Sequence, residues 1–253
     1  MIKCRYTKFG IPIEHIWFYD KQEEMKDSGI MFYHAVGDDM DGVVKVKNHS
    51  LITDLSMDEN TLFQKIRKND RYEIRRAQKE QVRCEFFSAN DIKHRTDLLD
   101  EFENTYNHMF EDKNMKTRFN RKLVERYMSM DAIYFTIGFY DHVPYVFHSY
   151  IYDSSSKQVR FFYSCSPYRR EKELSNLIGR INKLLHWQDM CHFKDQSILL
   201  YDWGGVSSLD NPNGIDKFKM GFGGDPVSYY NVLTSNGFWT RKLLILAKRL
   251  RVL

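Results

Sequence analysis

The sequence of 253 residues is long enough for one large domain or two smaller lobes with a buried core. Lysine and arginine exceed aspartate and glutamate by four (38 minus 34), an excess that suits a phosphate-bearing ligand but is too small to indicate nucleic acid. Cys4, Cys84, Cys165 and Cys191 stand singly, which disfavours a disulfide scaffold and a structural metal site. We therefore expect free thiols in a reducing cytosol and no metal.

The first part of the chain predicts strands followed by a helix. β-Branched and aromatic residues indicate strands at 13–19, 29–35, 43–46 and 50–55, with an acidic turn at 37–42. Ser56 and Glu59 have the spacing of a capping box, so a helix is expected to start there and to continue to about Gln81.

The remaining elements alternate between helical and extended patterns. Strands are expected at 83–87, 132–140, 144–153, 158–165, 197–201 and 227–233, and helices at 90–108, 120–129 and 171–192, with a short helix or turn at 214–221. The connection at 141–143 is typical of a hairpin. From residue 83 onward, the order is strand, two helices, three antiparallel strands, helix, strand, short helix, strand.

The helix predicted after residue 56 has a strongly basic face. Its cations are Arg67, Lys68, Arg71, Arg75, Arg76 and Lys79. Such a face is either a solvated surface or a phosphate-binding surface, and the sequence pattern leaves both interpretations open.

The most informative segment lies near the C-terminus. Tyr201-Asp202-Trp203-Gly204-Gly205-Val206 precedes Gly214-Ile215-Asp216-Lys217-Phe218-Lys219-Met220-Gly221-Phe222-Gly223-Gly224. Glycines directly after an apolar run suggest a strand end that opens onto a ligand. This segment resembles the C-terminal signature of FemAB/FemX-like transferases of the GNAT (N-acyltransferase) superfamily, and Arg71-Tyr72-Glu73-Ile74-Arg75-Arg76-Ala77 resembles the arginine-rich helix of the same family.

The resemblance covers residues 50–234 and implies an α/β (α+β) fold with a mixed, mainly antiparallel twisted sheet flanked by helices. We expect a truncated N-terminal GNAT-like lobe at 1–82, an acyltransferase domain at 83–235 and a basic amphipathic tail at 236–253. Full-length FemX-like proteins resemble two tandem copies, so the shortened first copy is a departure from that pattern.

The chemistry implied by the resemblance is attack of an amine on an activated acyl carbonyl, which needs proton removal and oxyanion stabilisation. Asp202 follows a strand end and is a candidate to accept a proton or orient the nucleophile. Lys219 matches the lysine of the family's Phe-Lys pair, which implies a role in stabilising negative charge. His148 is a candidate general base because imidazole titrates near neutral pH, and a buried structural histidine is the alternative. Substrate-binding candidates are Tyr201, Trp203, Phe218, Arg71 and Arg75.

In GNAT proteins the donor pyrophosphate lies at the start of the helix after the fourth strand, which implies residues 164–172 here. The usual Gly-x-Gly/Ala loop for coenzyme A is replaced by Ser166-Pro167-Tyr168-Arg169-Arg170. Ser166, Arg169 and Arg170 are the candidate donor-binding residues, although arginines are common at exposed helix starts. The donor is acyl-coenzyme A or an aminoacyl-tRNA.

The C-terminal segment 238–253 interleaves cations with apolar residues, as helices that lie on anionic bilayers do. Packing on the domain or on a second subunit is the alternative. The charged N-terminus and the absence of about 18 consecutive apolar residues indicate neither a signal peptide nor a transmembrane helix. We therefore expect a cytoplasmic protein, with the inner membrane face as a site of peripheral contact.

The leading hypothesis is an N-acyltransferase of cell-envelope or surface-polysaccharide assembly that acts on an amine of a sugar nucleotide or lipid-linked precursor. One alternative is an aminoacyl-tRNA-dependent, FemX-like aminoacyltransferase with the basic helix facing tRNA. Another is a non-catalytic, membrane-peripheral interaction module anchored by the C-terminal tail.

Overall fold

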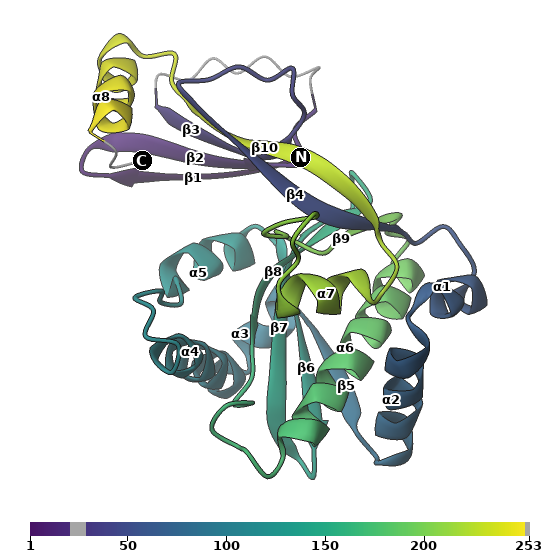
Figure 1. Cartoon of the computed structure of the whole chain (residues 1–253). Helices are drawn as coiled ribbons and strands as arrows, with labels where there is room; N and C mark the ends of the chain where they lie inside the picture. Colours follow the sequence, from purple (N-terminus) through teal and green to yellow (C-terminus); the bar gives the residue numbers. More distant parts are fainter. Residues whose placement is uncertain (21–28, 251–253) are drawn as a thin grey trace. The chain divides into compact units, whose positions relative to one another are not determined.

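The computed structural model describes residues 1–20 and 29–250 and contains two compact units (Figure 1). Unit 1 is built from 1–51, 205–216 and 225–253, and unit 2 from 52–204 and 217–224. The sequence alone placed a boundary near residue 82. The structure instead packs residues 52–82 within unit 2, because their helices lie against a helix of that unit.

Unit 1 is a five-stranded sheet with one helix. Its strands are β1 (Ile2–Lys8), β2 (Ile11–Trp17), β3 (Ile30–Val36), β4 (Val44–Asp54) and β10 (Asp225–Thr234), in the order β1-β2-β3-β10-β4. Its core contains Ile16, Met31, Tyr33, Val36 and Val232. The helix α8 (Phe238–Arg249) packs through Leu244 against Val43 and Leu233.

Two features of unit 1 differ from the expectation. β1 was not predicted, although Ile2 and Cys4 alternate with polar residues and are buried. β10 was expected to complete the acyltransferase domain, but it pairs antiparallel with β3 and lies between β3 and β4. Local patterns identify a strand, whereas its partner depends on contacts with residues far away in the sequence.

Unit 2 has a mainly antiparallel sheet. Its strands are β5 (Arg83–Ser88), β6 (Ile133–Tyr140), β7 (Val143–Asp153), β8 (Gln158–Cys165) and β9 (Leu200–Asp202), in the order β9-β8-β7-β6-β5, with the last residues of β4 beside β9. β8 and β9 are parallel, and β5 to β8 are antiparallel. Asp141 and His142 both have positive φ, as a two-residue hairpin turn requires.

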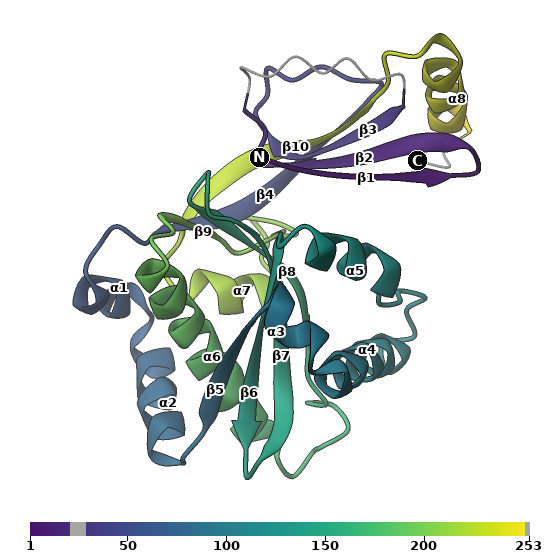
Figure 2. The ribbon, with the colours of Figure 1, turned by 180° about the vertical axis from the view of Figure 1, so that it is seen from behind.

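Helices cover both faces of this sheet (Figures 1 and 2). They are α1 (Glu59–Lys65), α2 (Lys68–Lys79), α3 (Ala89–Lys93), α4 (Thr96–Glu111), α5 (Arg121–Ser129), α6 (Ser175–Asp195) and α7 (Gly214–Met220), whose first turn belongs to unit 1. α6 crosses β5, β6 and β7 on one face with α2 beside it, and α3 to α5 lie on the other. Gly138 of β6 lets α6 approach closely, because a Cβ there would lie 2.4 Å from Cγ2 of Ile181.

Two helices predicted as continuous are broken. The predicted helix from Ser56 is α1 and α2, and its cap is Asp58, which accepts from Thr61 N at 3.0 Å. Between them Ile66 is extended and buried, and Arg67 N donates to Gly221 O at 2.7 Å. The Arg67 N–H, which lies between α1 and α2, thus finds its acceptor in the segment after α7 instead of within a helix. The helix predicted at 90–108 is likewise α3 and α4.

The predicted fold class is confirmed, since a large, mainly antiparallel mixed sheet is flanked by helices. Within the described ranges, the helices are all too short or too polar to cross a lipid bilayer.

Candidate functional site

The two parallel strands of unit 2 separate shortly after they pair. β8 and β9 are in register only from Gln158 opposite Leu200 to Arg160 opposite Asp202. Gly204 then adopts φ +71°, and a Cβ at this position would lie 2.8 Å from the carbonyl oxygen of Phe161. Only glycine meets both requirements without strain, so Gly204 carries the chain close past β8 where the strands diverge.

Charged residues lie at this divergence. Asp202 forms an ion pair with Arg160, the residue directly opposite it, and its other carboxylate oxygen accepts from Gly204 N at 2.8 Å. Asp202 therefore holds the turn as well as lying beside the candidate site. Lys219 of α7 is 8% exposed, and its Nζ lies 5.7 Å from the centre of the Phe161 ring.

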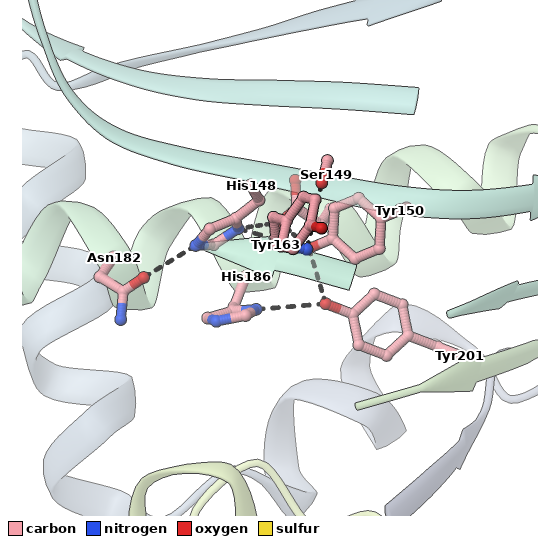
Figure 3. A network of polar contacts seen from close by, with 8 residues as sticks. His148, Ser149, Tyr150, Tyr163, Asn182, His186 and Tyr201 are labelled. Carbon is pink, nitrogen blue, oxygen red and sulfur yellow. Dashed lines mark hydrogen bonds and ion pairs between the residues drawn. The ribbon is translucent and has the colours of Figure 1, made fainter. Parts of the chain in front are cut away.

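A buried network of polar side chains lies next to this point (Figure 3). Alternation along β7 directs His148 and Tyr150 to the face that α6 covers, where Val146 packs on Ile181. Asn182, His186 and Asp189 follow one another at i, i+4 and i+7 on α6, so they share one side of that helix. Tyr201 of β9 completes the network.

The network is a continuous chain of hydrogen bonds. His148 Nδ1 lies 2.8 Å from Asp189 Oδ2, which also accepts from the Tyr150 hydroxyl. The Tyr150 and Tyr201 hydroxyls are 2.8 Å apart, and the Tyr201 hydroxyl lies 3.1 Å from His186 Nδ1. At the other end His148 Nε2 lies 2.9 Å from Asn182 Oδ1. Asp189 is fully buried, so these bonds compensate a charge that would otherwise be costly.

Burial shifts the titration of three groups in this network. Desolvation, followed by the charge of Asp189, raises the pKa of Tyr150 and of Tyr201 well above 10. Desolvation, followed by the charges of His148 and Lys219, lowers the pKa of His186 well below 6.5. Both tyrosines are therefore neutral donors at physiological pH, and His186 is a neutral imidazole.

Aromatic rings surround His186. The ring centres of Phe161 and Trp203 lie 4.9 Å from its imidazole, and those of Phe218 and Phe222 lie at 5.5 and 5.6 Å. Trp203 is fully buried and donates from Nε1 to Thr53 Oγ1 at 2.9 Å. The predicted substrate-binding residues Tyr201, Trp203 and Phe218 therefore meet around one imidazole that the sequence interpretation did not select.

The donor set of His148, His186 and Asp189 invites a test for a metal site. Their potential ligand atoms lie within 4.8 Å of one another. Two ligands of a tetrahedral zinc ion, each at about 2.0 Å, would be about 3.3 Å apart. His148 Nδ1 and Asp189 Oδ2 instead lie at hydrogen-bond distance, and His148 Nε2 lies at such a distance from Asn182. Hydrogen bonds thus account for both ring nitrogens of His148 in this structure.

The predicted donor-binding residues occupy another part of unit 2. The β8–α6 loop borders a cavity of about 520 Å³ lined by Asp112, Tyr168, Arg169, Arg170, Lys172 and Ser175. Ser166 and Arg170 also line a neighbouring cavity of about 270 Å³. Arg170 forms a two-pronged ion pair with Asp112. Its guanidinium would have to leave this carboxylate to bind a phosphate.

The two arginines predicted from the basic helix make local contacts on α2. Arg71 donates to Gln64 O at 2.6 Å, and the guanidinium of Arg75 lies 5.1 Å from the centre of the Phe63 ring. Neither contacts the buried network. The structure thus divides the predicted site residues among the strand divergence, the β8–α6 loop and α2.

Sequence interpretation missed Tyr150, Asn182, His186 and Asp189. A signal was present on the helix, because three polar residues at i, i+4 and i+7 interrupt its apolar pattern. No comparable signal exists for Tyr150, since tyrosine is common in half-buried strands.

No protein-family model matches the sequence, and no curated protein sequence matches it. Solved structures do. FemX has 11% identity and a TM-score of 0.57 over 77% of this chain and 63% of its own. The C-terminal domain assigned to a lysylphosphatidylglycerol synthetase from Agrobacterium fabrum has 11% identity and a TM-score of 0.56 over 88% and 72%. L-PGS from Bacillus licheniformis has 12% identity and a TM-score of 0.51 over 87% and 72%.

At these identities the likeness establishes the fold. It confirms the FemX-like fold expected from the C-terminal motifs, and this fold is shared with the lysylphosphatidylglycerol synthetase structures. The chain spans less than two thirds of the FemX structure. The likeness carries over neither activity nor substrates nor partners.

The buried tyrosines predict a stability that falls at alkaline pH. Above about pH 10 the unfolded chain loses tyrosine protons that Tyr201 retains in the folded state. The free energy of unfolding should then fall by about 1.4 kcal/mol per pH unit for this group. Urea unfolding of Tyr201→Phe between pH 9 and 11 should show a slope shallower by about that amount. The exposed Tyr72→Phe serves as the control, and an unchanged slope in Tyr201→Phe would contradict the assignment.

Proposed function

We propose that the protein is an N-acyltransferase that moves an acyl group from an activated donor, with acyl-coenzyme A favoured, to an amine of a sugar nucleotide or lipid-linked precursor of the cell envelope or a surface polysaccharide. The observation that carries the proposal is the location of Lys219, a nearly buried cation beside diverging parallel strands and a buried imidazole network. The FemX-like fold supports it.

The proposed chemistry needs a cation where negative charge develops. When an amine attacks an acyl carbonyl, the carbonyl oxygen becomes an oxyanion, and a fixed charge in a desolvated place stabilises it strongly. Lys219 has that burial, so it is assigned to the oxyanion. Trp203 and Phe218 pack around the His186 imidazole, and apolar walls of this kind exclude water that would hydrolyse the donor.

Two other predicted catalytic residues receive narrower roles. Asp202 is held by Arg160 and Gly204, which supports a part in orienting the nucleophile and the turn. His148 is fully buried with both ring nitrogens at hydrogen-bond distance from protein oxygens, which supports a part in positioning Asp189. Their direct roles in proton transfer stay predictions.

Donor binding is assigned to the β8–α6 loop. Ser166, Arg169 and Arg170 line its two cavities, and Lys172 adds a further cation. Several cations around a cavity suit the phosphates of coenzyme A.

Lys219→Met is expected to lower kcat by about 10²–10³-fold, because it removes the cation at the oxyanion. Acyl-coenzyme A thioesters should still raise the melting temperature of this variant, since donor binding is assigned elsewhere. The exposed Lys217→Met on the same helix is the matched control and should transfer at the wild-type rate. Full activity in Lys219→Met would remove this residue from the mechanism.

A second candidate function is favoured by the outer face of α2. Lys68, Tyr72, Arg75, Arg76 and Lys79 are exposed and recur with the spacing of one helix face. Cations interleaved with an exposed aromatic ring suit a nucleic-acid backbone and a stacked base. This supports an aminoacyl-tRNA donor and a FemX-like aminoacyltransferase in peptidoglycan or envelope assembly.

If α2 binds tRNA, the double variant Arg75→Gln/Lys79→Gln should weaken tRNA binding and reduce the salt slope of the affinity by about two units. Lys93→Gln/Lys122→Gln, on helices of the opposite face of the sheet, removes the same charge and should change the slope little. Fluorescence anisotropy over a salt series measures both. Equal slopes in the two variants, or no binding at low salt, would exclude this surface.

α8 of unit 1 supports action at the inner face of the membrane. Trp239, Leu243, Leu246 and Leu250 form an exposed apolar stripe, with Trp239 74% exposed. Lys242 and Arg249 flank it, and the helix contains no acidic residue. A stripe of this kind suits an anionic bilayer, and the amine acceptor or a lipid-linked saccharide would be reached there. The name lysylphosphatidylglycerol synthetase also denotes synthesis of a lipid by a protein of this fold.

Flotation with vesicles that contain anionic phosphatidylglycerol should recover the wild-type protein and lose the variant Trp239→Glu/Leu246→Glu, because a charge in the apolar stripe opposes insertion. Phe9→Glu, at an exposed turn of the same unit, is the control and should float like the wild type. Flotation without any donor binding would favour the non-catalytic interaction module. Equal flotation of both variants would exclude α8 as the contact.

A further inference from the structure

A series of hydrogen bonds connects Asp189 to His186 through two tyrosines. The number of protons in this series determines which group donates in each bond. Asp189 Oδ1 is buried and has no hydrogen-bond partner in the part of the chain that the structure describes, so a proton on that oxygen would have no acceptor there. The other carboxylate oxygen, Oδ2, is the acceptor in its contact with the Tyr150 hydroxyl, which donates its only proton to it. Consequently, the Tyr150 oxygen accepts from Tyr201 across the 2.8 Å contact.

The imidazole of His186 is the next group in this series of hydrogen bonds. Tyr201 has used its proton on Tyr150, so its oxygen must accept from His186 Nδ1 at 3.1 Å. A neutral imidazole has one N–H, and here it is on Nδ1. Nε2 of His186 therefore carries an unprotonated lone pair.

Nε2 makes no hydrogen bond to any described residue, although His186 is 2% exposed. The ring lies among Phe161, Trp203 and Phe218, none of which offers a side-chain partner to this nitrogen. Lys219 is close enough to affect the protonation of His186 electrostatically. His186 and Lys219 both lie against the Phe161 ring, at 4.9 and 5.7 Å from its centre, so the bare acceptor nitrogen and the cation assigned to the oxyanion belong to one cluster.

We propose that His186 Nε2 accepts the proton of the attacking amine, and that Asp189, Tyr150 and Tyr201 are positioning residues that keep this nitrogen unprotonated. The inference rests on the proposed acyl transfer and names the base for it. Substrates of the class are neutral primary amines that reach the imidazole next to Lys219.

The proton balance closes within one turnover. The amine nitrogen bonds to the acyl carbon while its N–H proton moves to His186 Nε2. The bond from the acyl carbon to the leaving sulfur or ribose oxygen then breaks, and that atom takes the proton from Nε2. His186 returns to its initial tautomer, and the products are an amide and a thiol or alcohol.

The charges around His186 suit this sequence of events. The groups that face it are His148, Lys219, Tyr201 and the Asp189 carboxylate beyond the tyrosines. Before reaction, burial and then the electrostatic influence of His148 and Lys219 hold the pKa of His186 low. As the oxyanion develops beside Lys219, its negative charge offsets that cation, and proton uptake at Nε2 becomes more favourable.

Tyr150→Phe tests the inference with a readout that is independent of activity. Without the Tyr150 hydroxyl, Tyr201 has His186 Nδ1 as its remaining hydrogen-bond partner among the described residues and should donate to it. His186 would then carry its proton on Nε2. Tyr152→Phe is the matched control, because it removes a hydroxyl from the same side of β7 and Tyr152 also packs on Phe193.

Nitrogen-15 NMR of histidine-labelled protein, with the His186 signals identified in His186→Gln, reports the tautomer. We expect Nδ1–H in the wild type and in Tyr152→Phe, and Nε2–H in Tyr150→Phe. Acyl transfer by Tyr150→Phe should have kcat lowered about 10²-fold or more with little change in KM, while Tyr152→Phe retains activity.

An Nε2–H tautomer in the wild type overturns the inference without use of any variant. A switched tautomer in Tyr150→Phe with unchanged kcat also overturns it. If the wild type transfers no acyl group to any amine, the proposed function fails, and the role of His186 as a base fails with it. The tautomer measured by NMR still shows whether the hydrogen bonds from Asp189 keep Nε2 unprotonated.

Discussion

Unit 2 is organised around the buried carboxylate of Asp189. A carboxylate removed from water is strongly unfavourable unless hydrogen-bond donors surround it, and here the donors come from His148 and Tyr150 of β7. This requirement ties α6 to the centre of the sheet and, through Tyr201, to β9. The same hydrogen bonds determine which group donates at each step from Asp189 to His186. The bonds that stabilise the buried carboxylate therefore also determine the tautomer of His186.

A second constraint acts at the divergence of β8 and β9. Gly204 passes the Phe161 carbonyl where no Cβ fits, and the Arg160–Asp202 pair closes the last rung of the parallel ladder. Gly221 adds a related contact, because its carbonyl accepts from Arg67 N at the break between α1 and α2. Glycines before and after α7 therefore let the chain approach β8 and the start of α2, and Lys219 lies between them.

Much of the fold could be predicted, because local patterns reflect local physics. The hairpin of β6 and β7 and the bounds of β8 follow from turn chemistry and alternation. The prediction of one continuous helix from Ser56 was wrong. The helix breaks at Ile66, because that side chain is buried and the next backbone N–H, of Arg67, donates to the carbonyl of Gly221. β10 has a strand pattern, but pairing with β3 is a contact nearly 200 residues away in sequence.

For the candidate site, the sequence by itself determined the motif residues: Lys219, Asp202, Tyr201 and Trp203 stand out because glycines and aromatics cluster there in a family-like order. Tertiary structure decided what surrounds them. His186 and Asp189 lie within an apolar helix, and their importance depends on which strand that helix covers. Periodicity encodes which side of an element is buried, whereas the partner of a buried polar group is chosen by packing between distant segments.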